Sequence, residues 1–165
     1  MSDPRPAHPP AEGARCDAAL GPVVLYDGAC GLCARSVRWI LRRDRRGVFR
    51  FASVQSSIGA ELVATACTPE QAAVARGLEG IVLIDGTKAF VRSDACAAIA
   101  RRLPFPWSLG ACLALVPRAV REAAYGFVAA RRHRWWGPPE ACEALRPEWR
   151  ARLLDRAERR GRDAE

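Results

Sequence analysis

Two cysteines separated by two residues, Cys30 and Cys33, are the residues of this chain whose types and spacing most clearly indicate chemistry. The apolar run Val23–Tyr26 precedes them, and a segment with helical periodicity follows. The pair therefore lies where a buried strand passes into a helix, a context that is typical of thiol–disulfide exchange. The sequence predicts a redox-active Cys-x-x-Cys site at this junction.

The predicted helix begins at Cys30, and a helix N-terminus presents free backbone N–H groups and the positive end of the helix dipole. A thiolate at this position is stabilised, which lowers the thiol pKa below its free value of about 8.5. At about 100° per residue, Cys33 falls on the apolar face of the helix with Val37 and Leu41. We therefore expect Cys30 to be the accessible attacking thiolate and Cys33 to be the buried resolving thiol.

Zinc binding is an alternative role for these two thiols. Structural zinc takes four ligands, usually from a second Cys-x-x-Cys or from a pair of histidines. The other cysteines are isolated from one another along the chain, and the two histidines are His8 and His133. We therefore predict no metal and no cofactor, and zinc binding stays open as an alternative.

Length and composition indicate one globular domain with a short tail. The chain has 165 residues, half of them hydrophobic, with a formal net charge of +8. Residues 1–21 are rich in Pro, Ala and Gly, which predicts a disordered N-terminal tail rather than a signal peptide. The longest apolar stretch, 109–116, is too short to span a bilayer, so we expect a cytoplasmic protein.

The seven cysteines form an odd number, which argues against a full framework of disulfides. Cys67, Cys96 and Cys112 lie among alanines and leucines, so we predict that all three are small core hydrophobes. Cys16 falls in the tail and is expected to be a free thiol. Cys142 is expected to be a surface thiol, with a third redox partner as the alternative.

Arginine supplies almost all of the positive charge, in clusters at 42–46, 131–134 and 159–162. Basic patches can bind nucleic acid or anionic lipid, but aromatic residues are not interleaved with the first and third clusters. We therefore predict no specific nucleic-acid binding. The second cluster runs into Trp135 and Trp136, a combination that favours contact with a membrane surface or a partner protein.

The elements that must position the cysteines follow from periodicity and from turn and capping residues. Thr68 and Gln71 form a capping box, and Asp85-Gly86 predicts a hairpin turn. The expected elements are strand 23–26, helix 30–44, strand 48–51, helices 58–66 and 69–77, strands 81–84 and 88–91, and helix 93–102. This order predicts an α/β fold with a thioredoxin-like βαβ–α–ββα core over residues 22–103.

The last third of the chain has a different character. Prolines interrupt it, and helical segments are expected at 108–116, 118–134 and 147–160. We predict that residues 104–160 form a helical extension packed on the core.

The run from Tyr26 to Cys33 resembles the signature of the DCC family of thiol–disulfide oxidoreductases, which is named for its Asp-x-x-Cys-x-x-Cys motif. Segments 84–86, 92–95 and 117–137 resemble further blocks of that family, so that the likeness covers residues 22–155. The resemblance implies Cys30 and Cys33 as the redox pair, with Asp27 as the third signature residue. Asp27 could accept a proton from a thiol, or it could shape the turn that aims Cys30.

The chain departs from ordinary thioredoxins in one respect. Thioredoxins carry a cis-proline just before the third strand, facing the Cys-x-x-Cys, whereas this chain has Leu78-Glu79-Gly80 there. Recognition of a substrate backbone in the usual manner is therefore in question.

The sequence as a whole predicts a thiol–disulfide oxidoreductase. Its expected partners are a disulfide-containing protein or a small-thiol substrate and a cellular thiol reductant. The alternative is a redox-sensing module that docks to a membrane or a protein through its basic, tryptophan-containing extension.

Overall fold

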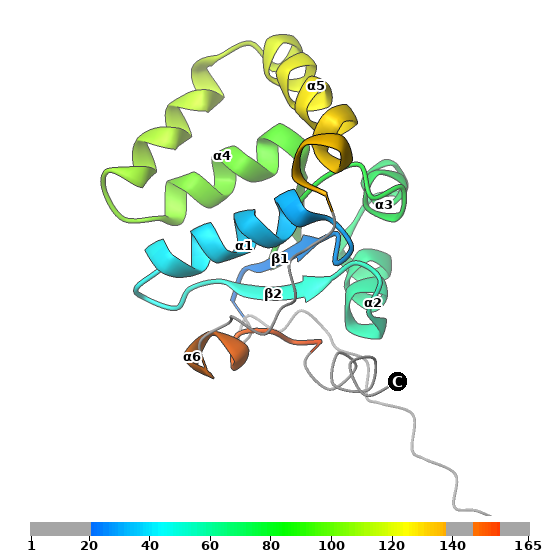
Figure 1. Ribbon diagram of the computed structural model, residues 1–165, viewed down its shortest axis with the longest axis vertical. Coiled ribbons are helices and arrows are strands. Elements are labelled where there is room, and N and C mark those ends of the chain that lie inside the picture. Colours follow the sequence, from blue (N-terminus) through cyan, green and yellow to red (C-terminus); the bar gives the residue numbers. More distant parts are fainter. Residues whose placement is uncertain (1–20, 138–146, 156–165) are drawn as a thin grey trace, which may run out of the picture.

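A central four-stranded sheet organises the molecule. Figure 1 shows its strands β1 and β2 between helices. The structure, a computed structural model, describes residues 21–137 and 147–155. The strands are β1 (Val23–Tyr26), β2 (Arg50–Ser53), β3 (Val82–Asp85) and β4 (Lys88–Val91), in the order β2-β1-β3-β4. β1 pairs in parallel with β2, whereas β3 pairs antiparallel with both β1 and β4. This mixed α/β sheet confirms the thioredoxin-like fold class.

Helices cover both faces of the sheet, and the alternation of side chains along β1 decides which face each residue meets. Val24 packs in the cluster that includes side chains of α1 (Gly31–Arg43) and α4 (Arg92–Arg102). Val23 and Leu25 pack in the opposite cluster, with α2 (Ser57–Ala66) and α3 (Pro69–Arg76). Because both faces are covered, β1 is fully buried, as its continuous apolar run predicts.

Side-chain capping determines where α3 begins. The Thr68 hydroxyl accepts a hydrogen bond from the Gln71 N–H at 3.3 Å, and the Gln71 side chain accepts one from the Thr68 N–H at 2.9 Å. The predicted capping box at the start of α3 is therefore confirmed.

The second strand begins two residues later than the alternation at 48–51 predicts. The Asp44 carboxylate accepts hydrogen bonds from the N–H groups of Val48 and Phe49, at 3.1 and 2.9 Å, and so holds them in the turn after α1. β2 then begins at Arg50, which is the register partner of Val23. A buried acceptor at the end of α1, rather than strand propensity, sets this boundary.

The C-terminal third adds η1 (Trp107–Leu115), α5 (Arg118–Trp136) and α6 (Pro147–Arg150). η1 is a 3₁₀ helix, and α5 lies against α1 and α4 (Figure 1). None of the described helices combines the length and the apolar character that crossing a bilayer requires.

The helix expected over residues 147–160 ends at Arg150, and the chain then pairs with the free edge of β2. The Phe51 N–H donates to the Arg152 carbonyl at 2.9 Å, and the Leu154 N–H donates to the Phe51 carbonyl at 2.8 Å. These bonds satisfy backbone groups of an edge strand that would otherwise face solvent. Tertiary pairing therefore overrides the helical periodicity of this segment as far as residue 155.

Candidate active site

The turn between β1 and α1 places Cys30 at the N-cap of α1, where its backbone is extended (φ −106°, ψ 120°). Its N–H donates to the Asp27 carbonyl at 3.3 Å, and its own carbonyl accepts from the Ala34 N–H at 3.0 Å. A Cβ on Gly28 would come within 2.9 Å of the Ser53 hydroxyl, so glycine lets the turn pack closely on the end of β2. The Cys30 side chain consequently starts at the positive end of the α1 dipole.

Asp27 is 2% exposed, and both of its carboxylate oxygens have partners. Oδ1 accepts hydrogen bonds from the Ala29 N–H at 2.9 Å and from the Gln55 amide nitrogen at 2.7 Å. Oδ2 lies 3.7 Å from a guanidinium nitrogen of Arg132. The Gln55 amide oxygen in turn accepts from the Gly28 N–H at 3.1 Å. Asp27 and Gln55 together therefore clamp the turn that presents Cys30.

The exposure of Cys30 differs from the predicted one. Cys30 is 0% exposed, so the expected accessible Cys30 is wrong for this conformation. Cys33 is half-buried and packs against the core cluster, so its predicted burial is met in part. The end of α5 contributes to the burial of Cys30, because the Gly31 N–H donates to the Gly137 carbonyl at 3.1 Å and so holds the end of α5 against the start of α1. A helical wheel cannot include this contact, because the covering residues lie far along the chain.

Burial is the main cause that raises the pKa of the Cys33 thiol to about 12. The charge of Cys30 and a hydrogen bond to the Cys30 sulfur raise this pKa as well, while a hydrogen bond with the Asp27 backbone and the charge of Arg132 oppose the shift. Cys33 therefore stays protonated at neutral pH and donates its S–H to Cys30.

We expect alkylation of Cys33 by iodoacetamide to be slow at pH 7 and to accelerate about tenfold per pH unit up to about pH 10. The thiolate is the reacting form, and its fraction rises tenfold per unit at every pH below the pKa, which here is raised to about 12. Peptide mapping by mass spectrometry measures the rate, with the exposed Cys112 as the internal reference. A Cys33 rate that levels off below pH 9 would contradict the raised pKa.

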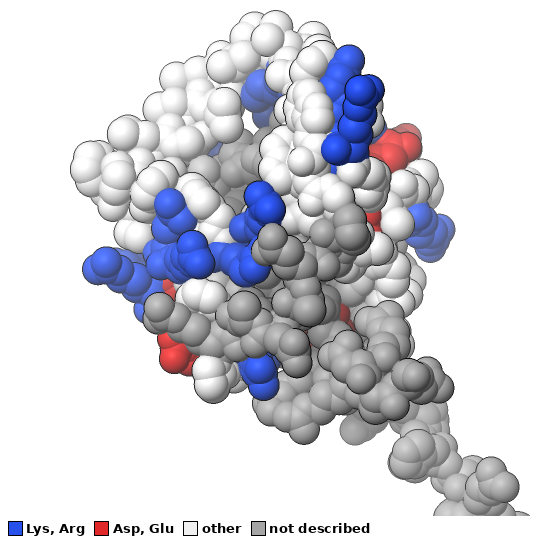
Figure 2. All heavy atoms as spheres, viewed as in Figure 1, with Lys and Arg blue, Asp and Glu red and all other residues white. Residues whose placement is uncertain are grey.

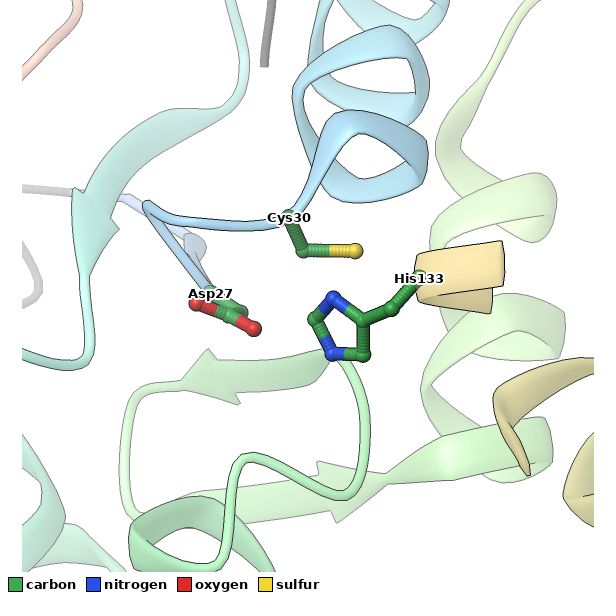
Figure 3. Close-up of side chains that lie close together, drawn as sticks. All are labelled: Asp27, Cys30 and His133. Atoms are coloured by element: carbon green, nitrogen blue, oxygen red, sulfur yellow. The ribbon is translucent and has the colours of Figure 1, made fainter. Parts of the chain in front are cut away.

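His133, on the last turn of α5, joins Cys30 and Asp27 in space (Figure 3). The ligand atoms of these three side chains all lie within 4.8 Å of one another. The neighbouring Arg132 is 8% exposed, and its Nε donates to His133 Nε2 at 3.2 Å. Sequence reasoning missed His133 as a site residue. The available signal was its place in the Arg131–Trp136 segment, which drew attention only for docking.

A metal ion at Asp27, Cys30 and His133 is disfavoured by the charges around them. These residues offer one carboxylate, one thiolate and one imidazole, which are ligand types that zinc accepts. However, the buried Arg132 guanidinium is 3.7 Å from the Asp27 carboxylate and is bonded to His133. A fixed positive charge in contact with two of the three groups repels a second cation. The Arg132 charge therefore makes this cluster a poor site for zinc.

The loop that precedes β3 is bonded to α5. The Arg132 guanidinium donates a hydrogen bond to the Leu78 carbonyl, and the Ile81 N–H donates to the Tyr125 hydroxyl oxygen at 3.0 Å. A Cβ on Gly80 would collide with the Tyr125 ring. Polar backbone groups at the position of the thioredoxin cis-proline are thus satisfied by side chains of this chain.

The remaining cysteines divide between core and surface. Cys67 and Cys96 are half-buried and pack against the two core clusters, in agreement with their prediction as core residues. Cys112 is exposed on η1, so its prediction as a core residue is wrong. Cys16 and Cys142 lie outside the described residues.

Comparison with known proteins adds family information to this geometry. Residues 24–138 match the family model described as DCC1-like thiol-disulfide oxidoreductase. The uncharacterized protein YuxK of Bacillus subtilis is 32% identical over 132 residues, which cover 80% of this chain and 93% of YuxK. A chloroplastic DCC family protein of Arabidopsis thaliana is 30% identical over 125 residues, which cover 74% of this chain and 69% of that protein. No solved structure matches the chain significantly.

Proposed function

Because the chain belongs to the DCC1-like thiol-disulfide oxidoreductase family, we propose that it exchanges thiols and disulfides through Cys30 and Cys33. The observation that carries this proposal is the pairing of a cysteine at the N-cap of α1 with a second thiol that is held protonated beside it. The helix dipole favours a thiolate on the first sulfur, and the second can then attack the mixed disulfide.

In the proposed reaction, the Cys30 thiolate attacks one sulfur of a substrate disulfide and releases the other sulfur as a thiolate. Cys33 then gives up its proton and attacks the Cys30 sulfur of the mixed disulfide, which releases the reduced substrate and leaves a Cys30–Cys33 disulfide. A cellular thiol reductant resets the pair. Since Cys30 is buried, the first step requires the end of α5 to move away from the start of α1.

Two further residues receive roles in this proposal. His133 Nε2 accepts from Arg132, so a neutral imidazole carries its hydrogen on Nδ1, and this N–H is proposed to hydrogen-bond the Cys30 sulfur beside it. Asp27 holds the turn through Ala29 and Gln55, and it pairs with the buried Arg132. Asp27 is therefore proposed as a positioning residue.

The substrates that suit this reaction are protein disulfides or small thiols and disulfides, in a thiol-reducing cytoplasm. The reduction potential of the pair would indicate in which direction the protein works. Potentials of known thiol oxidoreductases run from roughly −120 to −270 mV.

A redox titration in glutathione buffers, followed by thiol labelling and mass spectrometry, tests the proposal. We expect Cys30 and Cys33 to form one reversible disulfide with a potential in that range of roughly −120 to −270 mV. The Cys67 and Cys96 thiols, which the structure places apart in the two core clusters, should stay reduced under the same conditions. Failure of Cys30 and Cys33 to form a disulfide would contradict the proposed function.

Docking to an anionic membrane is a second candidate, favoured by the exposed end of α5. Phe127 and Trp135 are 53% and 50% exposed, with ring centroids 6.0 Å apart. The Arg131 guanidinium lies 3.7 Å from the Phe127 ring centroid. Figure 2 shows basic side chains gathered over α1 and α5 on one face of the molecule. Aromatic rings beside cations suit the headgroup region of an anionic bilayer.

We expect the protein to co-sediment with phosphatidylserine vesicles at low salt, and less so as the salt concentration rises. Salt screens the attraction between exposed charges, whereas phosphatidylcholine vesicles, which lack the net charge, serve as the control. Absence of binding to phosphatidylserine at low salt would eliminate this candidate.

A further inference from the structure

The half-buried Cys33 lines a cavity of about 640 Å³ between α1, α4, η1 and α5. Its size falls in the range of small-molecule sites, and its walls are mainly apolar. Apolar side chains from each of the four helices line it, among them Trp39, Ile99, Trp107, Leu113 and Val128. The Tyr125 hydroxyl and the Arg132 guanidinium are polar groups in the same walls. The cavity therefore combines an apolar body with a few donors next to a sulfur.

A polypeptide substrate cannot reach Cys30 while α5 is in place, whereas a small molecule can reach Cys33 through the cavity. Cys30 is buried, and it does not line this cavity. The backbone groups of Leu78 and Ile81, to which an extended peptide could bond, are already bonded to Arg132 and Tyr125. The accessible sulfur is that of Cys33, and it is reached through an apolar space.

We propose that this cavity admits the reductant that resets the oxidised protein, and that the reductant is a low-molecular-weight dithiol with an apolar body. The inference rests on the proposed function and adds the chemical class of its electron donor. The cavity volume suits a small molecule, and the apolar walls favour a hydrocarbon chain over a charged or hydroxylated one.

In the proposed reduction, the dithiol attacks the Cys33 sulfur of the Cys30–Cys33 disulfide. A thiolate of the dithiol attacks the Cys33 sulfur, a new S–S bond forms, and the Cys30–Cys33 bond breaks. Cys30 leaves as a thiolate at the N-terminus of α1, which makes it the better leaving group. The second thiol of the ligand then attacks the ligand sulfur of the mixed disulfide and releases Cys33. The ligand becomes a cyclic disulfide, and its two protons pass to Cys30 and Cys33.

The cavity also contains groups that suit an incoming thiolate. The Tyr125 oxygen accepts from Ile81, which leaves the Tyr125 hydroxyl hydrogen for another acceptor. The Arg132 guanidinium is close enough to Cys33 to act on its charge. Both groups stabilise negative charge on a sulfur that approaches Cys33.

Two matched dithiols test the proposal on the oxidised full-length chain. Butanedithiol is a four-carbon chain with a thiol at each end, and dithiothreitol is the same chain with two hydroxyl groups. With rates expressed per thiolate, we expect butanedithiol to reduce the Cys30–Cys33 disulfide at least about tenfold faster. Equal rates for the two dithiols would overturn the proposal, and this comparison needs no variant.

Substitutions that fill the cavity provide a second test of the proposal. Ala129 lines the cavity on α5, whereas its neighbour Ala130 is exposed and does not line it. We expect Ala129→Trp to abolish the preference for butanedithiol and Ala130→Trp to retain it. Ala100→Phe, which fills the cavity from α4, should act like Ala129→Trp and replaces it if circular dichroism shows that Ala129→Trp does not fold.

The outcomes separate this inference from the proposed function. If glutathione buffers give a reversible Cys30–Cys33 disulfide but the filled variants keep the wild-type preference, the cavity is not the route and only this inference fails. If no Cys30–Cys33 disulfide forms, the proposed function itself fails. Loss of the preference in the filled variants, with normal titration in glutathione, supports the inference.

Discussion

Replacing Cys30 by serine is expected to lower the rate of disulfide exchange by at least about a thousandfold. Serine keeps the size and the position at the N-cap of α1 but removes the sulfur that forms the mixed disulfide. Cys33 cannot take over the attack at neutral pH, because its pKa is raised to about 12. The measurement is the rate at which the reduced protein reduces a disulfide-bonded peptide.

Two further cysteine variants serve as a control and as a test of the second step. Cys112→Ser changes an exposed thiol on η1 and should retain the wild-type rate. Cys33→Ser should keep the first step and lose the second, so that intact-mass spectrometry detects the peptide bound to Cys30. A Cys30→Ser variant with the full exchange rate would show that the proposed mechanism is wrong.

Asp27→Ala is expected to lower the free energy of unfolding by about 3 kcal/mol. The Asp27 and Arg132 side chains are 3% and 10% exposed, so removal of the carboxylate leaves a buried guanidinium without its counter-charge. The Ala29 N–H and the Gln55 amide also lose their acceptor. Urea unfolding of the reduced protein measures the change.

Asp27→Asn distinguishes the two roles that the sequence leaves open for this residue. An asparagine oxygen can still accept from Ala29 and Gln55, but asparagine also removes the charge that faces Arg132, so we expect a loss of about 2 kcal/mol, a little smaller than for alanine, and a largely unchanged exchange rate. A proton-transfer role would instead cost about a hundredfold in rate, because an amide does not accept the proton. Unfolding of Asp27→Ala at the wild-type urea concentration would refute the structural role.

α5 connects the stability of the site to its reactivity. This one helix supplies the hydroxyl and the guanidinium that bond the loop before β3, the imidazole beside Cys30, and part of the cavity wall at Cys33. A movement of α5 would therefore uncover Cys30 and change the cavity in the same event. The proposed protein substrate and the proposed dithiol would approach the two sulfurs from different sides.

Features that depend on neighbouring residues could be predicted from the sequence. A continuous apolar run predicted the buried strand β1, and helical periodicity after Cys30 predicted α1. The capping box at Thr68 and the turn at Asp85-Gly86 marked the start of α3 and the β3–β4 hairpin. These signals are local, since a strand, a helix start or a tight turn is decided by residues within a few positions of one another.

The groups that surround the two sulfurs could not be predicted from the sequence, because helix packing brings them together. His133 reaches Cys30, and the end of α5 covers it, through contacts between residues that are far apart along the chain. Tertiary packing also buried Cys30, which was expected to be accessible, and ended the last helix at Arg150. Burial and long-range hydrogen bonding depend on how the helices pack together, and the periodicity of a single segment does not contain that information.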